Sequence, residues 1–143
     1  MPYLKKRSTQ FILVTVIALA FTGCHPFDDA KKALNRYCPN FAVGLDSVSV
    51  DEYMNFDLSS RKRYTIKYDS NDESFVERYF HDKGNGFYRK KDNNFYKKDI
   101  DDSEFLEDDD EALGRLFKRG NNSAVVIFNQ TKKSIIIIEF FKK

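Results

Sequence analysis

Carboxylates are the most concentrated reactive groups in this sequence, and they gather in one short segment. Nine Asp or Glu residues lie among the 13 positions of residues 99–111. Carboxylate oxygens bind Ca²⁺, and a pair of them can act as acid and base in glycoside hydrolysis. Counted as an EF-hand loop from Asp99, the segment has Glu104 where the loop needs Gly and Asp110 where it needs a bidentate Glu. We therefore expect a solvated loop that leads into a helix. The spacing leaves open a looser divalent-ion site or a carboxylate-dependent hydrolase.

Histidine and cysteine are scarce, which argues against several kinds of catalytic and metal site. The chain has two His and two Cys, without the spaced clusters that zinc sites use. No Ser lies in a nucleophile elbow that would work with His81, and no Gly-rich loop has the spacing for phosphate binding. Cys38 is typical of a small buried residue, with a nucleophile or an intermolecular disulfide as the alternative. We expect a protein that is not an enzyme, with no catalytic residue, no metal and no cofactor.

Aromatic and basic residues alternate in two short segments that repeat the same order. Residues 87–91 and 95–99 begin eight positions apart. In an extended chain, alternate side chains face opposite sides, so each segment places an aromatic residue and a basic residue on one face. Such a face suits an acidic protein, lipid headgroups or an anionic polymer. The alternative is that the rings fill the core while the cations solvate edge strands. The residues that we predict to form a partner-binding surface are Tyr88, Lys90, Tyr96 and Lys98.

The charge balance argues against nucleic acid as the partner. The chain carries 24 Lys and Arg against 22 Asp and Glu, but Lys5, Lys6 and Arg7 belong to an N-terminal segment with its own role. Without these three, 21 basic residues face 22 acidic ones, a net charge of −1. Nucleic-acid binding depends on an excess of cations that contact phosphates, so we expect no nucleic-acid partner.

The first 24 residues have the three parts of an export signal. The basic residues 5–7 precede an apolar run of 11 residues over 11–21, which is shorter than the ~20 that a membrane-spanning helix needs. The sequence Phe21-Thr22-Gly23-Cys24 then resembles the lipobox of bacterial lipoproteins, although Phe21 stands where Leu is usual. The alternative is an uncleaved anchor helix with Cys24 unmodified.

The lipoprotein resemblance implies a cell-envelope protein with a lipid anchor. Residues 1–23 would be removed, and Cys24 would carry two acyl chains on sulfur and one on its amino group. Three chains give stable attachment, whereas one gives only reversible binding. His25 follows Cys24, which in a Gram-negative host implies the outer membrane, facing the periplasm. Residues 24–27 form only a short tether, so the domain is expected to work at the membrane surface.

Periodicity predicts a single α+β domain over residues 28–143, mainly an antiparallel sheet with two short helices. Apolar residues at helical spacing predict a helix over 28–37, ended by Pro39. Alternation predicts strands between residues 41 and 68, with a polar connection over 57–62. The isoleucines at 135–138 predict a strand in the middle of the sheet. A β-meander is predicted over 75–81, 87–91 and 95–99, and the glycines in its first turn allow positive φ. A helix is predicted over 108–119, with Gly120 at its C′ position. Residues 124–128 and 134–141 are predicted to pair as a hairpin.

A second resemblance covers residues 79–106. Asp82-Lys83 and Phe87-Tyr88, with Ile100 and Phe105 downstream, are similar to a bacterial repeat family named for its Asp-Lys-Asn-Tyr-Tyr motif. The resemblance implies β structure and transfers no functional residue.

These observations together predict a membrane-anchored lipoprotein that binds a protein partner without catalysis. An inhibitor, an immunity protein or an assembly factor would fit this description. The alternatives are a carboxylate-dependent envelope hydrolase and a structural lipoprotein with no discrete ligand.

Overall fold

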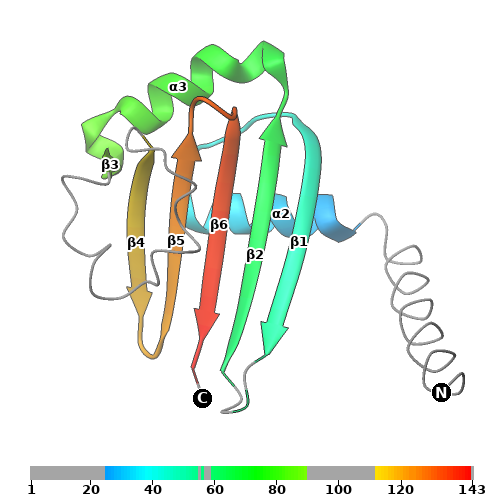
Figure 1. The fold of residues 1–143 in the computed structure, drawn as a ribbon. Helices are drawn as coiled ribbons and strands as arrows, with labels where there is room; N and C mark the ends of the chain where they lie inside the picture. Colours follow the sequence, from blue (N-terminus) through cyan, green and yellow to red (C-terminus); the bar gives the residue numbers. More distant parts are fainter. Residues whose placement is uncertain (1–24, 55, 57–58, 90–111, 143) are drawn as a thin grey trace, which may run out of the picture.

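The computed structural model describes residues 25–54, 56, 59–89 and 112–142 (Figure 1). Within these residues, six strands form one antiparallel sheet and two helices pack on one of its faces. This arrangement confirms the predicted α+β fold class. The elements are α2 (His25–Tyr37), β1 (Leu45–Met54), β2 (Ser60–Tyr68), the 3₁₀ turn η1 (Ser70–Asp72), α3 (Glu73–His81), the 3₁₀ turn η2 (Lys83–Asn85), β3 (Tyr88–Arg89), β4 (Leu113–Arg119), β5 (Asn122–Asn129) and β6 (Ser134–Phe141).

The strands follow the order β1-β2-β6-β5-β4-β3, and each neighbouring pair is antiparallel. β6 lies between β2 and β5, which confirms that the isoleucine-rich strand belongs inside the sheet. Ile135 and Ile137 belong to the core that the helices cover, whereas Ile138 belongs to a smaller buried cluster with Val125 and Ile127. Because successive side chains of a strand face opposite sides, this second cluster lies on the other face of the sheet.

The two ends of the sheet differ. At the end that we call the hairpin end, β1 ends at Met54, β2 begins at Ser60, the β4–β5 turn lies at residues 120–121, and β6 ends at Phe141 (bottom of Figure 1). At the opposite end, called the α3 end, α3 lies beside the turn between β5 and β6. The side-chain amide of Gln130 in that turn donates a hydrogen bond of 3.2 Å to Glu77 of α3.

α2 packs on the sheet through small and apolar residues. Ala30, Ala33 and Leu34 are buried at the i, i+3, i+4 spacing of one helix face. The helix begins at His25, three residues before the predicted start, and ends at the predicted Tyr37. Within the described residues, no helix is both long enough and apolar enough to cross a membrane.

Residues 75–81, predicted as a strand, lie in helix α3, so that prediction is wrong. Val76 and Phe80 are fully buried and stand four residues apart, about one helical turn. Phe80 stacks on Phe128 of β5, with ring centroids 4.7 Å apart and an interplanar angle of 9°. The spacing of the buried residues is therefore that of a helix face, because a strand would bury every second residue.

Residues 113–119, predicted as part of a helix, form strand β4, so that prediction is also wrong. β4 pairs with β5 along its whole length. Leu113 and Phe117 fit a helix at i, i+4 and also fit the alternation of a strand, and pairing with β5 decides between the two. Gly120 has a φ of 61° and begins the two-residue turn between β4 and β5, instead of ending a helix.

The predicted β-meander is described only in part. β3 covers two residues of the strand predicted over 87–91, and residues 90–111 lie outside the described residues. Gly86 has a φ of 78°, which confirms the positive φ expected in the turn before residues 87–91. The polar connection predicted over 57–62 ends earlier than expected, because β2 begins at Ser60 and pairs with β1 from there.

Candidate functional site

α2 crosses one face of the sheet about midway along its strands (Figure 1), and the candidate site lies between this helix and the hairpin end. Asp29, near the start of α2, lies 3.8 Å from the Lys62 ammonium of β2. Arg36, near the end of α2, reaches Glu139 of β6. Lys62 and Glu139 are paired across β2 and β6, two residues before the strands stop at Ser60 and Phe141. Side chains at both ends of the helix therefore interact with residues near this end of the sheet.

A groove of about 360 Å³ opens between α2 and the hairpin end of β4, β5 and β6. Its floor lies at Ala124 and Glu139, which face each other across β5 and β6. The small side chain of Ala124 leaves space above Glu139. The residues that define this α2 groove are Arg36, Tyr37, Phe117, Arg119, Glu139 and Phe141.

Glu139 is a buried carboxylate, with 4% of its side chain exposed. Burial of a carboxylate is costly unless hydrogen bonds and an opposite charge offset it. Arg36 Nη1 donates to Glu139 Oε2 at 2.6 Å, and Tyr37 Oη donates to the same oxygen at 2.5 Å. Both donors come from the last turn of α2, so this three-residue cluster fixes the helix to β6.

The pKa values of both donors in the cluster are raised. Burial raises the pKa of Tyr37 to about 12, and the hydrogen bond to Glu139 adds to the rise. The interaction with the Tyr37 hydroxyl and the charge of Glu139 raise the pKa of Arg36 above its ordinary value. At neutral pH Tyr37 is therefore a neutral donor and Arg36 is a cation, and both lie against the Glu139 carboxyl group.

Above this cluster, the groove has cationic and apolar walls. Half of the Arg36 side chain is exposed, and Arg119 is exposed beside it. The Phe117 ring packs against Tyr37 with centroids 5.2 Å apart, and Phe141 closes the side at the end of β6. Apolar walls with a few fixed polar groups are typical of binding sites. A ligand with an apolar part and a negative charge fits this surface.

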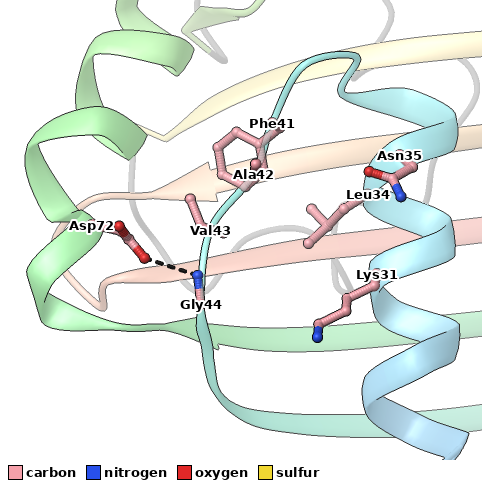
Figure 2. Close-up of a pocket in the computed structure, with 8 residues that line it drawn as sticks. All are labelled: Lys31, Leu34, Asn35, Phe41, Ala42, Val43, Gly44 and Asp72. Carbon is pink, nitrogen blue, oxygen red and sulfur yellow. Dashed lines mark hydrogen bonds between the residues drawn. The ribbon is translucent and has the colours of Figure 1, made fainter.

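A second hollow, of about 470 Å³, lies on the other side of α2 (Figure 2). Lys31 and Leu34 extend from α2 toward the segment 41–44, and Asp72 faces that segment from the α3 side. The Asp72 carboxylate accepts a hydrogen bond of 2.8 Å from the backbone N–H of Gly44. A Cβ at Gly44 would lie 3.3 Å from the Asp69 side chain, so the segment passes close to this turn. The Asp72 carboxylate thus holds segment 41–44 against the turn before α3. Because its role is structural, the α2 groove remains the better candidate site.

A third hollow, of about 370 Å³, lies at the tip of the hairpin end. Tyr53 and Met54 of β1 line it together with Arg61 of β2 and Phe141 of β6. Because Phe141 also lines the α2 groove, the two hollows meet at this residue.

The residues singled out in the sequence have different outcomes. Tyr88 lies on the edge strand β3 opposite Gly114 and is 47% exposed. Its neighbour Phe87 is buried and packs against Phe80 with ring centroids 4.7 Å apart. Lys90, Tyr96 and Lys98 lie outside the described residues, as do Cys24 and the acidic residues 99–111. The predicted surface therefore stays a prediction.

The surroundings of Cys38 and His81 favour a structural role for each residue. Cys38 is fully buried, and burial raises the pKa of its thiol to about 12, so little reactive thiolate forms at neutral pH. A ring nitrogen of His81 lies 3.0 Å from the side-chain oxygen of Gln130. In the part of the chain that the structure describes, no group of three or more His, Cys, Asp or Glu is placed to hold a metal ion.

Sequence reasoning did not find the Arg36–Tyr37–Glu139 cluster. The available signal was Glu139 itself, a single charge that directly follows four isoleucines in a strand covered on both faces. A charge in such a strand needs a partner from the layer above it.

Comparison of the chain with protein-family models, with curated proteins and with solved structures finds no match.

Proposed function

We propose that this chain is a lipid-anchored envelope lipoprotein that binds a protein partner in the α2 groove and is not an enzyme. In a Gram-negative host it would lie at the outer membrane, facing the periplasm. The signal-like residues 1–24 support the anchor. The observation that carries the binding role is the groove itself, whose buried Glu139 is held by Arg36 and Tyr37 beneath an apolar and cationic rim.

The partner is expected to present an acidic residue beside an apolar one. Arg119 and the exposed part of Arg36 would attract the acidic side chain, and Phe117 and Phe141 would contact the apolar one. Desolvated charges and aromatic anchors at the centre of an interface carry most of its binding energy. A lipoprotein of this kind serves as an inhibitor, an immunity protein or an assembly factor, and the identity of the partner would distinguish these roles.

The test is affinity capture with the lipidated chain purified in detergent. The affinity tag is placed in the β5–β6 turn, at the α3 end and away from the groove. Envelope and secreted fractions of the source organism serve as prey, and mass spectrometry identifies the captured proteins and the lipid on Cys24. The critical variant is Arg119→Glu, and Lys83→Glu is the control, because it makes the same charge change at an exposed residue of the α3 end.

One stoichiometric protein is expected with the wild type and with Lys83→Glu. Capture by Arg119→Glu should fall about tenfold or more, as for a charge inside an interface. Equal capture by Arg119→Glu would exclude the groove as the binding surface. Loss of capture with Tyr88→Ala instead would assign binding to the edge-strand surface predicted from the sequence. Absence of any captured protein, or an unmodified Cys24, would contradict the corresponding half of the proposal.

A further inference from the structure

The sheet ends at β1 on one side and at β3 on the other, and these two edges differ. β3 has two residues, a length that offers little backbone for another strand to pair with. β1 has ten residues, and its register with β2 is irregular only between Leu45 and Ser47. Among the described residues, no strand pairs with the outer side of β1. About half of the backbone N–H and C=O groups of residues 47–54 therefore point outward.

β1 lacks the residues that most often block an edge strand. Lys and Pro are common at protected edges, and residues 45–54 contain neither of them and no Arg. The strand instead carries three exposed acidic residues, Asp46, Asp51 and Glu52. If two copies of β1 paired with each other, three acidic residues from each copy would meet along one edge. Like charges across strands are destabilising, so this composition disfavours a second copy of the chain as the occupant.

The pairing of β1 with β2 shows which charges suit its side chains. Asp51 stands opposite Arg63, and Glu52 stands opposite Lys62. The Lys62 ammonium lies 3.4 Å from the Glu52 carboxylate. Opposite charges on facing residues stabilise a strand pair. A strand that carries Lys or Arg would therefore complement the outer side of β1 as β2 complements its inner side.

α2 extends past β1 at the edge of the sheet (Figure 1). Phe27, in the first turn of α2, stands three and seven residues before Ala30 and Leu34, which are buried in the core. This spacing places Phe27 on the helix face that meets the sheet, yet 38% of the residue is exposed, because the described sheet ends at β1. Val48 and Val50 face the same core from β1. An apolar side chain of an added strand would contact Phe27 beside these valines.

We propose that the outer edge of β1 binds an extended segment of a partner protein as an additional antiparallel strand, in which apolar and basic residues alternate. The apolar side chains would face α2 and Phe27, and the basic side chains would lie on the other face, beside Asp51. In this mode of recognition, backbone hydrogen bonds supply affinity and alternate side chains supply specificity. The inference depends neither on the lipid anchor nor on the α2 groove, which lies between α2 and strands β4, β5 and β6.

The test uses the full chain, purified in detergent, and a short synthetic peptide in which Val and Lys alternate. A peptide of alternating Val and Glu is the charge control. Two further Val–Lys peptides carry N-methyl groups, one on all valine nitrogens and the other on all lysine nitrogens. Because alternate nitrogens of a strand face the same side, only one of these two peptides should still pair with β1. Hydrogen exchange, resolved at single amides by NMR, reports where each peptide binds.

The Val–Lys peptide at saturation is expected to slow exchange about tenfold at alternate amides of residues 47–54 and to leave the amides of β5 unchanged. Asp51→Asn should weaken binding about two- to fivefold, as for one cross-strand charge pair. The control Glu73→Gln, which neutralises a carboxylate at the α3 end, should bind like the wild type. Phe27→Ser should also weaken binding, because the apolar side chains of the peptide lose their contact on α2.

Three results would overturn the proposal. The first is unchanged exchange in β1 with every peptide. The second is equal binding of both N-methylated peptides or of the Val–Glu peptide, because neither backbone pairing nor charge would then select the ligand. The third is slowing of the same amides that grows with protein concentration and needs no peptide, which would assign the edge to a second copy of the chain.

Discussion

Glu139 is the buried charge of the α2 groove, and its burial depends on its hydrogen-bond partners. It is buried in a strand of isoleucines, and two donors from α2 meet on one of its oxygens. A buried ion pair often adds little net stability relative to apolar residues, but removal of one partner is costly because the other is left uncompensated. The cluster is therefore better explained as a means of fixing α2 over β6, and so of shaping the groove, than as a source of stability.

Tyr37→Phe tests this role at the level of one hydrogen bond. The change removes a donor of 2.5 Å to Glu139 and keeps the ring that packs on Phe117. We expect the free energy of unfolding to fall by about 1 to 2 kcal/mol, the typical effect of a lost hydrogen bond to a charged group. Denaturant unfolding followed by circular dichroism measures it. Tyr53→Phe, at a half-exposed tyrosine, is the control and should change stability by less than about 0.5 kcal/mol. Equal effects of the two changes would contradict a structural role of the Tyr37 hydroxyl.

The tyrosines predict how stability depends on pH. Burial raises the pKa values of Tyr37, Tyr68 and Tyr79 to about 12, above the ordinary value of 10. Between these values the unfolded chain releases protons that the folded chain keeps. Stability is therefore fully present below pH 10 and is lost as the pH rises toward 12. Absorbance at 295 nm should show a group of tyrosines that ionises late and together with unfolding. Titration of all tyrosines near pH 10 in a folded chain would contradict the assignment.

At the scale of elements, local patterns predicted some segments correctly and failed at others for a physical reason. The helix that ends at Tyr37 was predicted correctly because its apolar residues fit only a helical period. The strand with four isoleucines was predicted correctly because β-branched residues favour strands and the run is apolar on both faces. α3 was predicted as a strand and β4 as part of a helix, because a short segment with few apolar residues can fit both a helical and a strand period. What decides is non-local: stacking of Phe80 on Phe128 for α3, and pairing with β5 for β4.

The α2 groove was beyond prediction for the same reason. Arg36 and Glu139 are separated by 103 positions in the sequence. No local window contains both, and only the strand order that places β6 beneath α2 brings them together. From the sequence, Glu139 could be predicted to be a buried charge, but its partners could be identified only from the tertiary structure.

The stability of the turn between β4 and β5 depends on the backbone conformation of Gly120. Gly120 has a φ of 61°, a conformation that residues with a Cβ rarely adopt, and a Cβ there would meet no atom within 4 Å. Gly120→Ala should therefore cost about 1 kcal/mol through backbone strain alone. Gly120→Asn should cost less than half of that, because Asn tolerates a left-handed backbone. Thermal unfolding of the two variants tests the order, and an Ala variant as stable as the Asn variant would contradict it.

At the scale of the whole molecule, the α2 groove lies toward one end of the sheet, the hairpin end. The α3 end faces away from it, and acidic and basic residues there offset one another, as in the pair of Lys133 with Glu73 at 3.4 Å. A partner bound in the α2 groove would therefore contact the hairpin end of the sheet.

Phe141 lines both the α2 groove and the hollow at the tip, whereas Met54 lines only the hollow. Phe141→Ser is therefore expected to weaken partner capture by several-fold, or about 1 kcal/mol, because it removes an apolar wall of the groove. Met54→Ser, at an exposed residue outside the groove, is the control and should leave capture unchanged. Circular dichroism must show that the Phe141→Ser chain is folded, as expected for a partly exposed residue at the end of a strand. If Met54→Ser weakens capture as much as Phe141→Ser does, the partner binds across the tip and the groove does not define the binding surface.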